Sequence, residues 1–409
     1  MSIICRPITA DEITPFFESR AFGFGHDFDP TEDGWMDRVR REAELDRTTA
    51  AFEDGTVVGT AGIWSFDLTV PGATVPTAGI TWVTVRPTHR RRGVLTAMMR
   101  TQLDNIHARG EALAALWASE APIYGRFGYG LAAEGVEMKI DRAHGSLRHV
   151  VPFSGRTRFV TRDEALAAWP GVYDRVRTTQ PGMISRSQEW WSGRQLREPE
   201  RPLPGSTKSF RVQYEEHGQA LGYVRYRIRE TYEAGSPAST LLIGELIAAT
   251  DAAYSALWSY IFGVDLVQTI TQEWGSVEEP LAHMLEDPRR LVRRTQDTLF
   301  VRVVDVAKAL AARRYAASGQ IIIEVDDAFC PWNSGRYLLR GGPDGARCSK
   351  TDAAAEVTLD VETLGALYLG GARFQAMARA GRVHGSPEAL LRADAMFAWD
   401  PLPWIPEMF

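Results

Sequence analysis

The sequence predicts an α/β (α+β) protein with mixed sheets and two to three domains. The chain has 409 residues, which is more than a single domain usually holds. Hydrophobic residues make up 44% and charged residues 24%, as in globular proteins with an apolar core, so a mainly disordered chain is excluded. Along the N-terminal third, β-rich runs alternate with helical patterns, which is typical of strands and helices that share one domain.

The first region, residues 1–145, has the clearest pattern. Thr9 and Glu12 fit a capping box at the start of a helix, and Asp54-Gly55 fits a hairpin turn. A second helix is expected where apolar residues recur on one face from Leu95 to Ile106. The strands expected in this region are 2–6, 49–52, 57–66, 78–85 and 112–119.

The middle region, residues 146–292, repeats this plan at a coarse level. A hairpin is expected around His217-Gly218, followed by a strand over 240–249. Thr250 or Asp251 then caps a helix whose apolar residues recur at intervals of three and four.

The last region, residues 293–409, begins a new set of elements. A strand at 298–304 leads into a helix capped by Asp305, and Ser386-Pro387 has the residue types preferred at a helix start. Further strands are expected near 320–326, 336–340 and 354–359, and further helices from Glu362 and near 371–381.

Charge and composition narrow the class of partner. The net charge of −6 gives no bulk attraction to nucleic acid or to an anionic membrane, so neither partner is expected. The longest uncharged stretch, 68–85, contains two prolines and two glycines, and it predicts strands and turns rather than a membrane span. Three scattered cysteines exclude a disulfide framework. The first residues lack a basic segment followed by a long apolar one, so we expect a cytoplasmic protein.

Arginines gather in one turn. Only four of the 46 basic residues are lysine, an imbalance that codon bias in a GC-rich genome explains by itself. The turn Arg90-Arg91-Arg92-Gly93 differs, because it connects a strand to the first turn of a helix, where free N–H groups attract an anion. Without an anion, each exposed arginine there opposes the helix dipole by about 0.3–1 kcal/mol. The pattern predicts a pyrophosphate-binding turn, and the alternative is a solvated basic turn without a ligand.

This turn and a second motif together resemble a known family. Arg90-x-x-Gly93 at a strand-to-helix turn resembles the coenzyme A pyrophosphate loop of GCN5-related N-acetyltransferases. The run from Ala118 to Gly130 follows the next strand, where that fold places a tyrosine near the thioester. With the three-part chain and its ending, the two motifs resemble the enhanced intracellular survival (Eis) family of bacterial acetyltransferases over essentially the whole length.

The resemblance implies the domains and the cofactor. It implies a catalytic acetyltransferase domain over 1–145, a second such domain over 146–292 and a sterol-carrier-like domain over 293–409. The second domain lacks a coenzyme A motif, because its equivalent turn, 248–251, has no arginine and no glycine. Acetyl-CoA would be the cosubstrate, and no metal is expected. The residues implied to hold the cofactor are Val83, Val85, Arg90, Arg91, Gly93, Val94, Leu95, Thr96 and Ser119.

The catalytic roles also come from the resemblance. Tyr124 would be the general acid that protonates the departing thiolate, and the terminal carboxylate of Phe409 would be the general base. For Tyr124 the alternative is a core aromatic residue with a satisfied hydroxyl. For the tail the alternative is a frayed chain end, although residues 398–409 carry two tryptophans and three prolines, which favour docking.

The expected substrate is a cationic primary amine, because the acidic balance of the chain favours a cation. The resemblance implies an aminoglycoside, and hence a link to antibiotic resistance, with Asp27, Trp35, Trp82 and Glu407 in the substrate pocket. The chain departs from aminoglycoside-modifying members at Met408, where those tend to be acidic. Protein lysines and polyamines stay open as substrates. Transfer would be direct, in a ternary complex, because no cysteine lies near the motifs.

Other functions have weaker support. The eight histidines show no metal-ligand spacing, and no nucleophile elbow or phosphate loop is present. The alternative from another class is a lipid-binding or sterol-carrier-like protein with a vestigial transferase. The charged residues Arg336, Arg340, Asp344 and Arg347 are expected to point inward, which argues against a long apolar cavity for a lipid. The family also implies self-association as a homohexamer.

Overall fold

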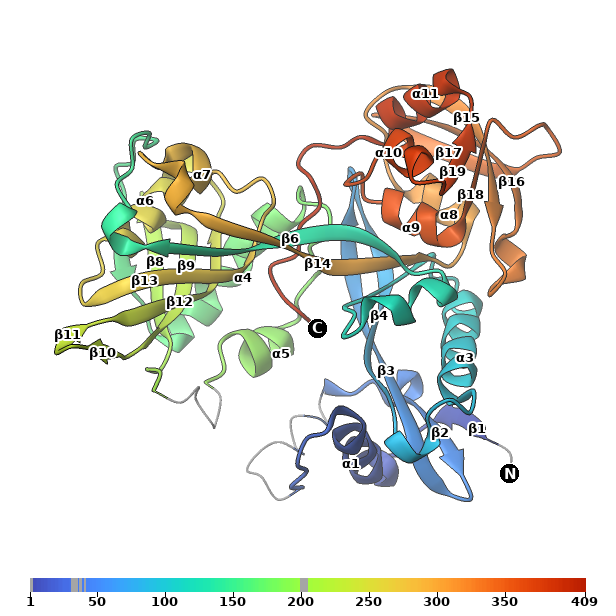
Figure 1. Ribbon diagram of the computed structural model, residues 1–409, viewed down its shortest axis with the longest axis horizontal. Coiled ribbons are helices and arrows are strands. Elements are labelled where there is room, and N and C mark those ends of the chain that lie inside the picture. Colours follow the sequence, from blue (N-terminus) through green and yellow to red (C-terminus); the bar gives the residue numbers. More distant parts are fainter. Residues whose placement is uncertain (1–2, 31–35, 37–38, 40–41, 199–204) are drawn as a thin grey trace. The chain divides into compact units, whose positions relative to one another are not determined.

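The computed structural model describes residues 3–30, 36, 39, 42–198 and 205–409. The chain forms two compact units (Figure 1). The first unit comprises residues 1–133, 299–400 and 409, and the second comprises residues 134–298 and 401–408.

The first unit contains a mixed sheet that carries the arginine turn. Its neighbour order is β1-β2-β3-β4-β5-β14, in which β4 and β5 run parallel and the other printed neighbours are antiparallel. The strands are β1 (Ile4–Pro7), β2 (Thr49–Glu53), β3 (Thr56–Val70), β4 (Ala73–Val85), β5 (Leu113–Leu116) and the end of β14 (Val292–Val303).

Two helices, α1 (Ile13–Phe24) and α3 (Val94–Ala108), cover opposite faces of this sheet. Phe16 of α1 packs with Ala50, whereas Met98 of α3 packs with Ala51. Successive residues of a strand point to opposite faces, so the two helices enclose the sheet between them. Three short 3₁₀ turns, Pro87–His89, Ala121–Ile123 and Gly125–Phe127, complete the part of the unit around the arginine turn.

A second sheet belongs to the same unit. Its order is β17-β16-β15-β18-β19, with only β15 and β18 parallel among its printed pairs. Its strands are β15 (Gly319–Asp326), β16 (Gly335–Gly342), β17 (Gly345–Lys350), β18 (Val357–Asp360) and β19 (Val383–Gly385). Its helices are α8 (Val306–Ala312), α9 (Val361–Leu367), α10 (Phe374–Arg379) and α11 (Pro387–Phe397).

One expectation about this region was wrong. Arg336, Arg340, Asp344 and Arg347 are all exposed, because on β16 they alternate with the buried residues Tyr337 and Leu339 or lie at and beyond the following turn. The buried cations of this region are instead Arg313 and Arg302, and the Arg302 guanidinium lies 2.7 Å from the Asp327 carboxylate. These four charged residues therefore do not argue against an apolar interior in this region.

The second unit is built on another mixed sheet. Its order is β6-β13-β12-β9-β8-β7, with β12 and β13 parallel. The strands are the unit's part of β6 (Gly130–Asp141), β13 (Val267–Gly275), β12 (Ser239–Ala248), β9 (Gln219–Arg229), β8 (Phe210–Glu216), β7 (Arg156–Phe159) and the small pair β10 (Tyr232–Glu233) and β11 (Ser236–Pro237). The helices are α4 (Arg162–Arg177), α5 (Gln188–Trp190), α6 (Asp251–Phe262) and α7 (Leu281–Met284).

Most predicted elements are confirmed, and so are three predicted caps. The side chains of Thr250, Asp305 and Ser386 each accept a hydrogen bond from the backbone N–H three residues later. For the second unit this settles the choice left open between Thr250 and Asp251 in favour of Thr250. In the described parts of the chain, no helix is long and apolar enough to cross a membrane.

Candidate active site

The candidate site lies in a wedge between two parallel strands of the first unit. β4 pairs with β5 from Thr77 to Ile80, and the pairing ends at Ile80 opposite Leu116 while β4 continues to Val85. Beyond that point the strands no longer close the sheet. The resulting pocket has a volume of about 550 Å³.

A bulge in β4 lies at the mouth of the wedge. Thr60 of β3 pairs with Thr84 and Gly62 pairs with Thr81, so Trp82 and Val83 together oppose one residue of β3. Trp82 takes a positive φ of 57°, a left-handed conformation that is rare for a large side chain. A β-bulge leaves one residue without a partner in the ladder and bends the strand, so the backbone of β4 turns toward the pocket.

The helix that follows the arginine turn begins without a side-chain cap. Its N-cap is Gly93, at φ 78°, and no side chain of the described residues accepts a hydrogen bond from the first turn of α3. The N–H groups of that turn are therefore available to an anion, and the helix dipole favours a negative charge there. A Cβ at Gly93 would meet no atom within 4 Å, so the space beside this backbone is open.

The three arginines of the turn have three different environments. Arg92 is paired with Glu53, which also lies 2.9 Å from His89 Nε2, so this carboxylate partly offsets the basic charge of the turn. Arg90 donates to the Gly23 carbonyl at 2.9 Å and holds the end of α1 against the turn. Arg91, by contrast, has no hydrogen-bond or ion-pair partner among the described residues. One guanidinium is thus left free in a pocket that already favours anions.

The structure brings together the whole predicted cofactor set. The pocket wall contains all nine residues and also Tyr124: Val83, Val85, Arg90, Arg91, Gly93, Val94, Leu95, Thr96, Ser119 and Tyr124. Arg92, which is not among the residues predicted to hold the cofactor, does not line the pocket.

Tyr124 combines burial with an unengaged hydroxyl. Its side chain is 5% exposed, and its ring meets Tyr129 edge to face at 6.1 Å. Among the described residues, no group forms a hydrogen bond with its hydroxyl, so this hydroxyl is available to a ligand or to solvent. Burial, with a smaller effect of the nearby Glu120, raises the pKa of Tyr124 to about 12. The phenol therefore keeps its proton at neutral pH and can act only as a donor of it.

The predicted substrate residues do not gather in this pocket. Asp27 is exposed and lines a separate hollow with Arg86 and Thr88. The Trp82 ring packs against Phe17 at 5.0 Å, on the side of the sheet that α1 covers. Trp35 lies outside the described residues.

The tail contains the other two predicted site residues. Within the second unit, the carboxylate of Glu407 is buried and accepts from Arg186 Nε at 2.5 Å, from Trp190 Nε1 at 2.8 Å and from Gln195. Arg186 also pairs with Glu245, with 2.5 Å between the closest atoms. Within the first unit, Phe409 is 7% exposed, and its ring meets Phe66 at 5.0 Å, so the chain end is docked rather than frayed.

Sequence reasoning missed several lining residues. Thr84 and Arg126 could have been found, since they lie between or beside predicted site residues. Gly23 and Phe24, at the end of α1, carry no motif, and only the folded chain brings them to the turn. Across the described residues there is no group of three or more His, Cys, Asp or Glu arranged to hold a metal ion.

Comparison with known proteins agrees with this arrangement. Residues 5–132 match an acetyltransferase (GNAT) domain, residues 182–303 match a second GNAT domain, and residues 306–406 match a sterol carrier protein domain. The chain is 41% identical to an uncharacterised N-acetyltransferase of Streptomyces avermitilis over 90% of both chains. It is 36% identical to N-acetyltransferase Eis of Mycobacterium tuberculosis over 97% of both. The crystal structure of Eis1 from Mycobacterium abscessus superposes with a TM-score of 0.86 at 32% identity, covering 99% of this chain and 100% of that one.

Proposed function

Since the chain belongs to the Eis family of N-acetyltransferases, we propose that it transfers the acetyl group of acetyl-CoA directly to a primary amine of a cationic substrate. The observation that carries this proposal is the free Arg91 beside the uncapped start of α3, in a pocket lined by the whole expected cofactor set. Acetyl-CoA would supply the acetyl group as an activated thioester.

The residues of the wedge fit the parts of this cosubstrate. The N–H groups after Gly93 and the guanidinium of Arg91 would bind the pyrophosphate, because both offer donors to an anion. The backbone of Val83 and Val85 would pair with the extended pantetheine arm where β5 has ended. The N–H of Val83, in the bulge, would stabilise the negative charge that develops on the carbonyl oxygen.

Tyr124 would donate a proton to the departing sulfur. A thiol has an ordinary pKa of about 8.5, which is lower than the pKa of this phenol. Complete proton transfer from Tyr124 to the thiolate is therefore unfavourable by itself. It becomes favourable only if the phenol regains a proton. The attacking amine must lose one proton as its nitrogen bonds to the acetyl carbon. We expect the carboxylate of Phe409 to take that proton, and the two transfers to be coupled.

The tail would then serve two purposes. Phe409 would supply the base, and Glu407 would anchor the tail through Arg186, Trp190 and Gln195 rather than contact the substrate. A carboxyl group with this many buried donors is costly to detach, because removal would leave Arg186 with one fewer partner. The aminoglycoside specificity expected from the family is therefore not carried by Glu407.

Coenzyme A release tests the activity. We expect turnover with acetyl-CoA and at least one amine from a panel of kanamycin, spermidine and a lysine peptide, and the responding amine identifies the substrate class. Absence of turnover on every amine, together with binding of a lipid, would instead support the carrier function. Light scattering of the same sample tests the expected hexamer.

Removal of Phe409 tests the base. The shortened chain keeps Glu407 and therefore its anchor, but its carboxylate is displaced by one residue. We expect kcat to fall by about 10²–10⁴-fold, the range for loss of a general base, with the KM for acetyl-CoA nearly unchanged. Unchanged kcat would show that the chain end is not the base.

A further inference from the structure

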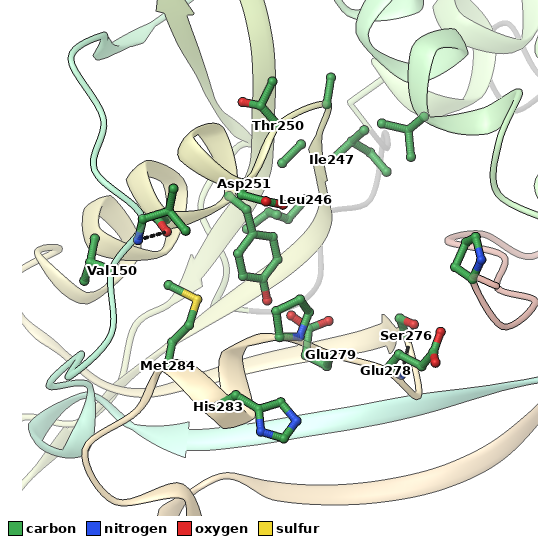
Figure 2. A pocket seen from close by; sticks show the side chains of 18 of the residues that line it. Val150, Leu246, Ile247, Thr250, Asp251, Ser276, Glu278, Glu279, His283 and Met284 are labelled. Atoms are coloured by element: carbon green, nitrogen blue, oxygen red, sulfur yellow. Dashed lines mark hydrogen bonds between the residues drawn. The ribbon is translucent and has the colours of Figure 1, made fainter.

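The second unit contains its own pocket, which is larger than that of the arginine turn. Its volume is about 930 Å³. The pairing of β12 with β13 ends at Ile243 opposite Gln272, while β12 continues to Ala248, so the pocket again occupies a wedge between parallel strands. Figure 2 shows Leu246, Ile247, Thr250 and Asp251 on one wall and Glu278, Glu279, His283 and Met284 on the facing wall.

Most of the pocket wall is apolar. Side chains from β12, from the segment before β7 and from α7 contribute hydrocarbon surface, and the rings of Tyr254 and Trp404 add aromatic surface. Such a wall favours a ligand with a hydrocarbon body, because binding removes apolar area from water on both partners.

Three polar side chains are buried in this wall. One of them, Ser255, already accepts from the Val151 N–H at 3.1 Å, and the other two are Gln272 and Glu279. Gln272, at the closed end of the wedge, is 7% exposed, and its amide oxygen has no hydrogen-bond partner among the described residues. Glu279 is 6% exposed. An unpaired buried acceptor costs free energy that a donor on a ligand would recover. Both groups therefore favour a ligand that brings a hydrogen-bond donor.

The charged residues around the pocket determine whether a cationic or an anionic ligand is favoured. Three carboxyl groups line it, those of Asp251, Glu278 and Glu279, and Arg148 is the one arginine or lysine among the described lining residues. Asp251 lies in the first turn of α6, where it opposes a phosphate. An anion is disfavoured, and a cation is attracted.

We propose that this pocket binds an apolar organic cation, a protonated amine with a hydrocarbon body of about six or more carbons. The N–H⁺ group would lie against Glu279 and the Gln272 amide, and the hydrocarbon would pack between β12 and Met284. The site is distinct from the acetyl transfer pocket, and it does not depend on the activity of that pocket.

The titration of Glu279 gives this site a distinctive pH dependence. Burial raises the pKa of Glu279 to about 8, against smaller lowering effects of the Leu281 and Ser276 backbone N–H groups and of Arg293. The carboxyl is then mostly neutral at pH 7, and a bound cation would favour its ionised form. Affinity should rise with pH through about 8, and binding at pH 7 should release a proton. The other titratable groups that line the pocket are Glu278, His283, Asp251, Tyr254, Arg148 and His149.

Calorimetric titration of the full chain tests the proposal. The probe is N,N-dimethylhexylamine, a tertiary amine that carries one N–H⁺ and forms no stable amide, so acetyl transfer does not interfere. The comparison compounds are the uncharged N,N-dimethylhexanamide and the anion hexanoate. We expect the amine to bind at least about tenfold more tightly than the amide, and hexanoate not to bind. Equal or tighter binding of either comparison compound would overturn the proposal.

A variant locates the bound amine. Glu279→Gln keeps the size and the acceptor oxygen but removes the charge, and we expect it to weaken amine binding by about tenfold and to abolish the rise in affinity between about pH 6.5 and pH 9. Glu286→Gln is the matched control, because it removes an exposed carboxylate of the same unit outside the pocket. If Glu279→Gln does not fold, the pH dependence and proton release of the unaltered protein decide the question. An affinity independent of pH would contradict the assignment to Glu279, whether or not the acetyltransferase assay succeeds.

Discussion

Both units of the molecule contain a wedge between parallel strands that opens beside the start of a helix. The two helices differ in whether a side chain caps their first turn. In the first unit the helix begins at Gly93 without a side-chain cap, beside Arg90 and Arg91. In the second unit Thr250 caps the helix by accepting from the Ala253 N–H at 3.1 Å. The same backbone thus offers its N–H groups to a ligand in one unit and satisfies them internally in the other.

The comparison shows that two or three side chains decide what such a wedge can bind. An uncapped helix start with a free guanidinium attracts a pyrophosphate, whereas a capped start followed by Asp251 opposes one. The tyrosine that lines each wedge differs in the same way, in whether its hydroxyl has a hydrogen-bond partner among the described residues. Tyr254 accepts from the Leu281 N–H at 3.2 Å, while the hydroxyl of Tyr124 has no partner among the described residues.

The strongest test of this contrast is Tyr124→Phe. Loss of the unengaged hydroxyl should lower kcat by about 10²–10⁴-fold and leave the KM for acetyl-CoA nearly unchanged, since a general acid acts mainly in the transition state. Tyr129→Phe is the control, because that hydroxyl is buried without a partner and its removal should retain activity and not destabilise the protein. If both variants retained full activity, Tyr124 would have no role in proton transfer.

The neighbouring arginines provide the next test. Arg91→Ala should weaken coenzyme A binding by about 10–100-fold, the range for one charge-assisted contact, and the loss should shrink as salt is added. Arg92→Ala should change it less than about threefold, because that guanidinium already pairs with Glu53. Fluorescence or calorimetric titration measures both. Equal losses would mean that the turn acts only through its total charge.

The second wedge can be tested through its stability. Between about pH 5 and pH 8 the buried Glu279 holds a proton that the unfolded chain releases, so this group destabilises the folded state progressively as pH rises. Glu279→Gln does not titrate, and we expect it to gain about 3–4 kcal/mol relative to the unaltered protein over that interval, since one pKa unit corresponds to about 1.4 kcal/mol. Urea unfolding at several pH values, with Glu286→Gln beside it, measures the difference. A difference that stays constant with pH would refute the raised pKa.

The smallest effect concerns the cap itself. Thr250→Ala removes the acceptor at the start of α6 and should lower stability by about 1 kcal/mol, while acetyl transfer stays unchanged. It should not create coenzyme A binding, because Asp251 remains in the first turn. Binding of coenzyme A to this variant at the second wedge would show that the cap alone had excluded it.

Local patterns in the sequence predicted much of this arrangement. The caps at Thr250, Asp305 and Ser386 depend on residues three apart, and the arginine turn is contiguous, so both could be found without the fold. The long strands β6 and β13 were not predicted, and neither was α4, although each packs in the described core. Their patterns were not recognised in the sequence.

Contacts between distant segments could not be predicted. Nothing in the sequence indicates that Arg186 pairs with both Glu245 and Glu407, because the three residues lie far apart along the chain. Arg336 and Arg340 were misplaced for a related reason: an alternating strand pattern is the same whichever set faces inward, and here the apolar set does. Trp35 lies outside the described residues, so its predicted role stays a prediction.

The anchored segment has a consequence for how the second unit closes. Arg186 pairs with both Glu245 and Glu407, which lie far apart along the chain. The buried network is therefore complete only when residues 401–408 have docked on the rest of the unit. A protease cut within 401–406 should loosen this network and lower the resistance of the second unit to urea.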